Sequence, residues 1–202
     1  MVNKFQSHPW HGVRLGDNAP DEVLAFIEIS PFDTIKYEID KPSGILKIDR
    51  PQKYSNVVPA LYGFLPQTYC AEAVKNLGNE AGYSAERGDG DPLDILVLSS
   101  HNIVHGNILL DAIPIGGIGL IDKSEVDDKV ICVLKGDALY GKYKDLSELP
   151  TEFIDKFKHY FLTYKNLPNQ APTCVIGSIY DSGHAKKVIL ASMEDYRTNF
   201  GI

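Results

Sequence analysis

The sequence contains few basic residues, few cysteines and no long apolar run. Lysine and arginine number 20 against 27 acidic residues, and the net charge of −7 argues against a nucleic-acid binder, which would present a basic surface. The three cysteines, Cys70, Cys132 and Cys174, are odd in number and widely spaced, so we expect buried, reduced thiols instead of a disulfide framework or a zinc site. Reduced thiols are typical of a cytoplasmic protein, which is the location we expect.

Segments that would direct the chain to a membrane are also missing. No stretch approaches the roughly 18 consecutive apolar residues of a transmembrane helix, so we expect no membrane partner. Residues 1–22 contain no apolar segment of the kind found in signal peptides. Linkers, low-complexity tracts and repeats are absent as well. Because 44% of the residues are hydrophobic, a real core can form, and we interpret residues 1–202 as a single domain.

What the sequence does contain is a series of strand patterns followed by helix patterns. Short β-branched runs bounded by turn residues predict strands at 23–29, 35–39, 45–49, 94–98, 107–122 and 129–134. The tetrapeptide KPSG at 41–44 is typical of a hairpin connection. Apolar residues at helical spacing predict helices at 149–167 and 185–200, whereas 64–88 has no clear period and is expected to be an elaborate surface loop.

This order of elements predicts an α+β fold that is mainly β. Closely spaced strands followed by helices favour a small β-barrel, over about 20–135, with the C-terminal helices at about 150–200 packed on its outside.

Two groups of aspartates stand at the ends of different predicted strands. Asp89, Asp91 and Asp94 occur within six positions in DGDPLD, and a second group comprises Asp122, Asp127 and Asp128. A solvated acidic turn is one interpretation of each group alone, and an EF-hand fails because its twelfth position would be a serine. If both groups face one cleft, divalent cations would neutralise them. Oxygen ligands without His or Cys favour Mg²⁺, or Mn²⁺, over zinc.

Cationic side chains accompany these acids at several points of the chain. Each could be an ordinary solvated charge, but cations beside carboxylates together predict a site for a polyanion bridged by several metal ions. The residues concerned are Lys36, which alternates with Glu38 in IKYEI, Arg50 at the end of LKIDRP, Lys129 after the second acid group, and Lys165 beside Tyr164.

At these residues the sequence resembles the soluble family I inorganic pyrophosphatases. DGDPLD at 89–94 matches the acidic motif of that family residue for residue, and IKYEID, SGILKIDRP, LYG, the Asp122–Asp127–Lys129 spacing and HYFLTYK match in the same order. The resemblance covers about residues 20–166, and 167–202 are expected to extend beyond the usual end of compact members. It implies an OB-like five-stranded β-barrel flanked by helices. It also implies a homo-oligomer that hydrolyses inorganic diphosphate to two orthophosphates with a Mg²⁺-activated water.

The resemblance also implies a role for each matching residue. Asp89, Asp94, Asp122 and Asp127 would be the metal ligands, and Asp91 would act as the catalytic base that orients and deprotonates the water. Lys36, Arg50, Tyr62, Lys129, Tyr164 and Lys165 would bind the substrate. Glu28 and Glu38 would be outer acids that tune metal-bound waters.

Two other interpretations stay open from the residues. The chain could hydrolyse another small polyphosphate or a nucleotide, although it contains no P-loop motif. It could instead be a non-enzymatic OB-type binding module, although its acidic charge disfavours nucleic-acid partners. The histidines of HNIVH at 101–105 lack the glutamate of a zinc-protease motif, so a zinc site is not favoured.

Overall fold

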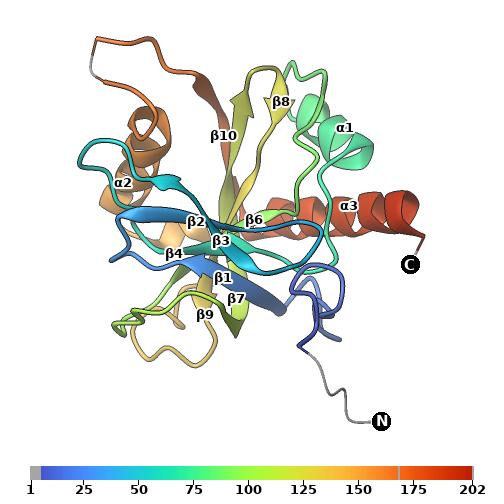
Figure 1. Ribbon diagram of the computed structural model, residues 1–202. Coiled ribbons are helices and arrows are strands. Elements are labelled where there is room, and N and C mark those ends of the chain that lie inside the picture. The colour runs from blue at the N-terminus through green and yellow to red at the C-terminus, as the bar shows by residue number, and fades with distance from the viewer. Residues whose placement is uncertain (1–5, 168, 202) are drawn as a thin grey trace.

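The computed structural model describes residues 6–167 and 169–201 (Figure 1). The longer strands are β1 (Val23–Ile29), β2 (Ile35–Ile39), β3 (Leu46–Pro51), β4 (Leu61–Phe64), β6 (Asp94–Leu98), β7 (Ile108–Asp122), β9 (Lys129–Leu134) and β10 (Cys174–Asp181). The two-residue strands are β5 (Arg87–Gly88) and β8 (Glu125–Val126), and the helices are α1 (Glu72–Glu80), α2 (Thr151–Thr163) and α3 (Ser182–Phe200).

Five strands close into a ring. β1 pairs with β4, β4 with β6, β6 with β9, β9 with β7, and β7 returns to β1. Every pairing is antiparallel except that of β6 with β9, which is parallel. The ring confirms the predicted OB-like barrel. The 15-residue β7 is long enough to extend past the ring and pair with β8 and β10 as well.

A separate two-stranded sheet of β2 and β3 lies across the front of the barrel in the view of Figure 1. Its strands are antiparallel, with Lys36 opposite Arg50, and the turn at 41–44 joins them as predicted. Both strands carry partly or largely exposed side chains, because this sheet has no layer of its own to cover its outer face. The hairpin is therefore an attachment to the barrel and not a part of its wall.

The barrel strands are continuous apolar runs because both of their faces are covered. In β6, Ile95 and Val97 belong to a core cluster that includes α3, whereas Leu96 and Leu98 belong to a cluster that includes α2. A strand buried on both faces loses the alternation of apolar and polar residues, which explains DILVL and KVICVL. Burial of the three cysteines, each under 6% exposed, confirms their expected role as small core residues.

Several elements differ from the predicted ones. The expected surface loop at 64–88 is wrong, because this stretch contains α1 and the buried residues Cys70 and Val74. The predicted helices are confirmed at slightly different bounds, as α2 and α3. Strands β4 and β10 were not predicted. β10 mixes glycine, serine and apolar residues and, among the described strands, pairs only with β7, so it has no clean alternating pattern.

The N-terminus of α1 is capped from the far end of the chain. Asp195 in α3 accepts hydrogen bonds from the backbone N–H groups of Ala71, Ala73 and Val74, at 2.9, 2.9 and 3.0 Å. The first N–H groups of a helix have no partner within the helix, so a carboxylate there replaces the local capping residue that α1 lacks. These hydrogen bonds fix α3 to the first turn of α1.

Among the described residues, the helices are too short or too polar to span a membrane. Neither α3, with 19 residues, nor any other helix within 6–167 and 169–201 is long and apolar enough to cross a bilayer.

We predict that Asp195→Ala lowers the free energy of unfolding by about 1–3 kcal/mol, because three partly or fully buried N–H groups lose their acceptor. Urea unfolding followed by circular dichroism measures this loss. Glu194→Ala, on the exposed face of the same helix, is the control and should change stability by about 0.5 kcal/mol or less. Equal stability of the two variants would contradict the capping role.

Candidate active site

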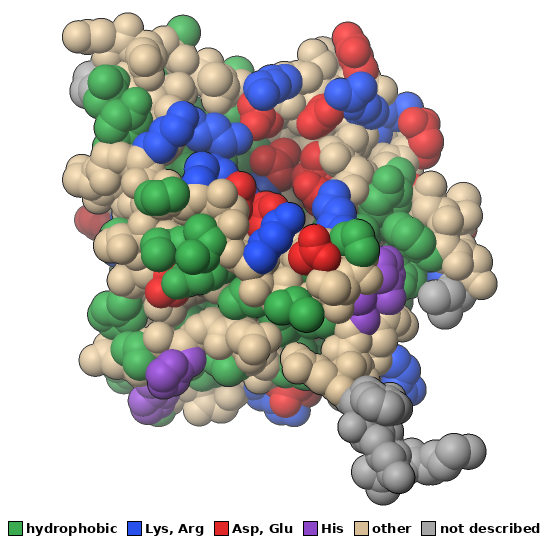
Figure 2. All heavy atoms as spheres, in the orientation of Figure 1, with side chains coloured by type: hydrophobic (Ala, Val, Ile, Leu, Met, Phe, Trp, Pro, Cys, Tyr) green, Lys and Arg blue, Asp and Glu red, His purple; other side chains and the backbone are tan. Residues whose placement is uncertain are grey.

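A cavity of about 630 Å³ opens where the barrel, the β2–β3 hairpin and the end of α2 meet. Figure 2 shows red and blue side chains gathered around a hollow in the upper half of this face. All the residues predicted for the site line this cavity. They are the acids Glu28, Glu38, Asp89, Asp91, Asp94, Asp122 and Asp127, the cations Lys36, Arg50, Lys129 and Lys165, and the tyrosines Tyr62 and Tyr164.

The first acid group lies on a tight turn that leads into β6. Gly90 has a φ of +74°, a conformation that glycine adopts without strain, and the Asp91 N–H donates to Asp89 Oδ1 at 3.0 Å. Cys70 holds this turn from below: its N–H donates to the Asp91 carbonyl at 2.9 Å, and its carbonyl accepts from the Gly90 N–H at 3.0 Å. Asp94 is the first residue of β6. The turn and the strand thus direct three carboxylates to one place.

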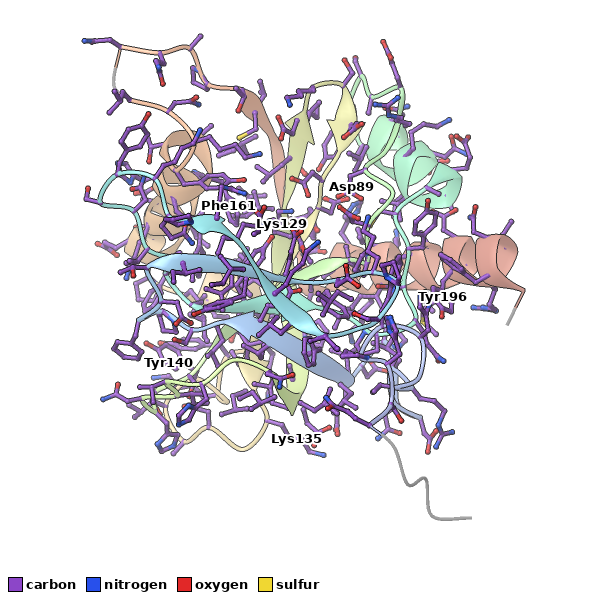
Figure 3. All side chains as sticks on the ribbon, viewed as in Figure 1. Asp89, Lys129, Lys135, Tyr140, Phe161 and Tyr196 are labelled. Atoms are coloured by element: carbon purple, nitrogen blue, oxygen red, sulfur yellow. The ribbon has the colours of Figure 1, made fainter. Side chains whose placement is uncertain are left out.

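Lys129 is the buried cation of the site. It is the first residue of β9 and is paired in register with Asp94, because β6 and β9 run parallel. Its side chain is only 4% exposed, and its Nζ contacts Asp94 Oδ2 and Asp127 Oδ1. Tyr62, on β4, also donates to Asp94 Oδ2. Figure 3 shows Lys129 and Asp89 near each other, above the β2–β3 hairpin in this view.

The pKa values of these groups reflect one cation among several acids. Burial alone would lower the pKa of Lys129, but the charges of Asp127 and Asp94 outweigh burial and raise it well above its ordinary value. Burial opposes ionisation of Asp127, yet Lys129 holds its pKa below the ordinary value. Burial, followed by the charge of Asp127, raises the pKa of Asp89 well above its usual range. One lysine therefore does not neutralise the cluster.

The donor chemistry of the cluster fits a hard divalent cation. Asp89, Asp94, Asp122 and Asp127 offer only carboxylate oxygens, and Asp122 Oδ1 is a buried atom without a hydrogen-bond partner. Within residues 6–167 and 169–201, however, no three acidic, His or Cys residues are already grouped as the ligands of one ion. The position of Lys129 Nζ between Asp94 and Asp127 accounts for this, because an ammonium there occupies the place between two prospective ligands.

The phosphate-binding candidates come from the hairpin and from the residues after α2. Lys36 Nζ donates to Asp49 Oδ2 at 2.9 Å, and the Arg50 guanidinium contacts the same oxygen. Lys165 Nζ donates to Asp122 Oδ2 at 2.7 Å. Each cation is thus held at the edge of the cavity by an acid, and a polyanion could compete with that acid for it.

Glu28 connects the hairpin to the barrel. It lies on β1 with an exposed fraction of 7%, and its Oε1 accepts the N–H of Ile39 in β2 at 2.8 Å. Burial raises the pKa of Glu28 to about 8, although the bond from Ile39 works in the opposite direction. An acid with such a pKa titrates near neutral pH, so it can respond to charges in the cavity.

The sequence prediction missed some residues of the cavity and misplaced one. Lys41, Lys47 and Glu125 line the cavity, and Asp49 bonds Lys36 at its edge. The alternation along β3 could have indicated Lys47 and Asp49, whereas no local signal indicates Lys41. Asp128 was grouped with Asp122 and Asp127, but it is 4% exposed and points into the core, where its charge raises the pKa of Tyr180 in addition to burial.

Comparison with known proteins decides the family. The sequence pattern of the family described as inorganic pyrophosphatase matches residues 25–197. The chain belongs to the inorganic pyrophosphatase family. It is 47% identical over 197 residues to the inorganic pyrophosphatase of Chlamydia trachomatis, with 94% of each chain covered. It is 34% identical to the soluble inorganic pyrophosphatase of Zea mays, covering 94% of this chain and 79% of that protein.

The fold agrees with solved pyrophosphatase structures. The crystal structure of inorganic pyrophosphatase from Thermus thermophilus superposes with a TM-score of 0.77 at 28% identity, covering 95% of this chain and 99% of that one. The expectation that residues 167–202 extend beyond the usual end of compact members is therefore wrong, because the similarity to this bacterial structure covers 95% of the chain. The family match continues to residue 197, so β10 and α3 are part of the pyrophosphatase fold.

We predict that Asp89→Asn stabilises the metal-free protein and reduces its response to Mg²⁺. The substitution removes a carboxylate whose charge is poorly compensated, and it also removes a prospective ligand. Thermal unfolding in EDTA and in saturating Mg²⁺ measures both effects. The exposed Asp111, on β7 and away from the cavity lining, supplies the control Asp111→Asn, which should show the wild-type response. An unchanged Mg²⁺ response of Asp89→Asn would exclude it as a ligand.

Proposed function

We propose that this chain is a Mg²⁺-dependent inorganic diphosphatase that converts diphosphate into two orthophosphates. The observation that carries the proposal is the convergence of every residue of the motif set on one cavity. Most of the acids come from the barrel and most of the cations from the hairpin and the residues after α2, the exceptions being Glu38 on β2 and Lys129 on β9. This separation suits a substrate whose metal-binding oxygens face one side and whose remaining phosphate charge faces the other. Membership of the pyrophosphatase family supports the same substrate.

The role proposed for each side chain follows from its position in the cavity. Arg50 offers a planar pair of donors to one phosphate, while Lys36 and Lys165 supply single charges. Lys129 and Tyr62 sit deeper, against Asp94, where they can contact the inner phosphate or orient that carboxylate. Asp91 lies on the turn before β6 at the open side of the cluster, with 49% of its side chain exposed. It can therefore orient an attacking water and accept its proton.

Magnesium is the proposed cofactor, with several ions at each site and Mn²⁺ as an alternative. Asp89, Asp94, Asp122 and Asp127 would hold these ions, and Glu28 and Glu38 would act on them from further out. When bound, the ions supply neutralisation of the substrate charge and a lowered pKa of water. The excess of acid over cation among the buried groups supports this cofactor, because the carboxylates repel one another without it.

We also propose that residues 1–202 act as one catalytic domain, in the cytoplasm and as a homo-oligomer. Apolar side chains exposed on β10 and α3, among them Val175 at 62% and Leu190 at 46%, support contact with a further copy of the chain. The three reduced cysteines support the cytoplasmic location.

We expect phosphate release from diphosphate in the presence of Mg²⁺, and much slower release from triphosphate or ATP. Release should stop on chelation and return with Mg²⁺. Calcium should support little turnover, since its larger and looser coordination shell suits a tightly held water poorly. A phosphate-release assay on the three substrates measures this. Full activity in EDTA, or preference for ATP, would refute the proposed function.

The three aspartates of the DGDPLD turn should separate into base and ligands. Asp91→Asn keeps the shape but cannot accept a proton, so we expect kcat to fall about 10²- to 10⁴-fold at every Mg²⁺ concentration. Asp89→Asn and Asp94→Asn should weaken Mg²⁺ binding and recover in part at high Mg²⁺. Steady-state kinetics beside calorimetric Mg²⁺ titration measures both. Recovery of Asp91→Asn by extra Mg²⁺, without recovery of Asp89→Asn, would reverse the assignments.

A further inference from the structure

Lys41 is a charged residue of the cavity for which neither the motif comparison nor the proposed mechanism gives a role. It occupies the turn between β2 and β3, and its Nζ forms an ion pair with Oδ1 of Asp91, on the turn that precedes β6. The pair links the β2–β3 hairpin to the barrel, which together enclose the cavity. No strand pairing links these two sheets among the described residues. The ion pair is only half buried, with side-chain exposures of 56% for Lys41 and 49% for Asp91.

The position of the Asp91 carboxylate depends on this contact, because hydrogen bonds fix the backbone of Asp91 but not its side chain. The Asp91 N–H donates to Asp89 Oδ1 at 3.0 Å, and its carbonyl accepts from Cys70 at 2.9 Å. Among the described residues, Lys41 is the one ion-pair partner of the Asp91 carboxylate, and Oδ1 accepts no hydrogen bond. Without it, Oδ1 of Asp91 would be a buried oxygen with no partner at all.

Lys41 itself is held through its backbone. Its carbonyl accepts a hydrogen bond from His8 Nε2 at 2.9 Å, while Nδ1 of the same ring accepts the N–H groups of Trp10 and His11 at 3.2 and 3.3 Å. These partners fix the His8 tautomer with its proton on Nε2. Gly44 completes the turn with a φ of +70°, and a Cβ there would lie 2.8 Å from the His8 ring. The segment around Trp10 thus fixes the position of the hairpin turn.

We propose that Lys41 is a positioning residue for Asp91. Lys41 affects the reaction through Asp91 and does not contact the reacting atoms itself. The inference rests on the proposed function, in which Asp91 accepts the proton of the attacking water. The ion pair holds Oδ1 towards the hairpin, and Oδ2 has no partner among the described side chains, so it is available for the water. A half-exposed pair contributes little to stability, so loss of Lys41 should alter kcat and not folding.

A double-mutant cycle with Lys41→Met and Asp91→Asn tests the proposal by diphosphate hydrolysis at saturating Mg²⁺. Lys41→Met should lower kcat about ten- to a hundredfold, because the base is misplaced, and should change KM about twofold or less. In the Asp91→Asn background the same substitution should change kcat about twofold or less, since there is no base left to position. Lys41→Arg, which keeps the charge, should restore most of kcat.

A lysine just after the hairpin provides the control. Lys53→Met removes an equal charge from the residues that follow β3, and the exposed Lys53 is not among the residues that line the cavity, so its effect on kcat should be much smaller. The thermal midpoint of Lys41→Met should differ from wild type by about 2 °C or less. Additive losses in the cycle, a loss confined to KM, or an equal effect of Lys53→Met would each overturn the role of Lys41. An inactive wild type would instead refute the proposed function itself.

Discussion

The ammonium of Lys129, enclosed between Asp94 and Asp127, is the interaction on which the site depends. A buried lysine is tolerable only beside carboxylates, and carboxylates this close together are tolerable only beside a cation. The parallel register of β6 and β9 places Lys129 directly opposite Asp94. The same strand pairing therefore closes the barrel and balances the charges of the cavity. A one-residue slip between these strands would break both.

Much of the barrel could be predicted from the sequence because its strands carry strong local signals. The runs at 23–29, 35–39, 94–98 and 129–134 became β1, β2, β6 and β9 with the same bounds. Two of the failures, α1 and β10, share a physical cause. α1 lacks a local cap, since its capping carboxylate is supplied by Asp195, 124 positions from Ala71, and β10 is specified by its pairing with β7. Neither partner can be identified from a local window.

The sequence predicted which residues form the site, but not which way each side chain points. Residue types and motif order brought together the full set that lines the cavity. Whether a side chain faces the cavity or the core depends on the backbone after a strand ends, and here adjacent aspartates diverge: Asp127 lines the cavity, while Asp128 is buried behind it. Lys41 reaches the cavity only because His8 and Gly44 fix the hairpin turn, and His8 lies 33 positions before Lys41 in the chain.

The hydrogen bonds between α3 and the segment before α1 have a consequence for how the protein matures during synthesis. Tyr69 N–H donates to the Ser192 carbonyl, and the next residue, Cys70, holds the acidic turn through Asp91 and Gly90. The barrel strands leave the ribosome well before α3 does, because α3 follows all of them in the chain. A nascent chain can therefore close its barrel while the acidic turn still lacks its support. The acidic turn therefore has its full set of supporting hydrogen bonds only after the helix at 182–200 has been translated and has docked.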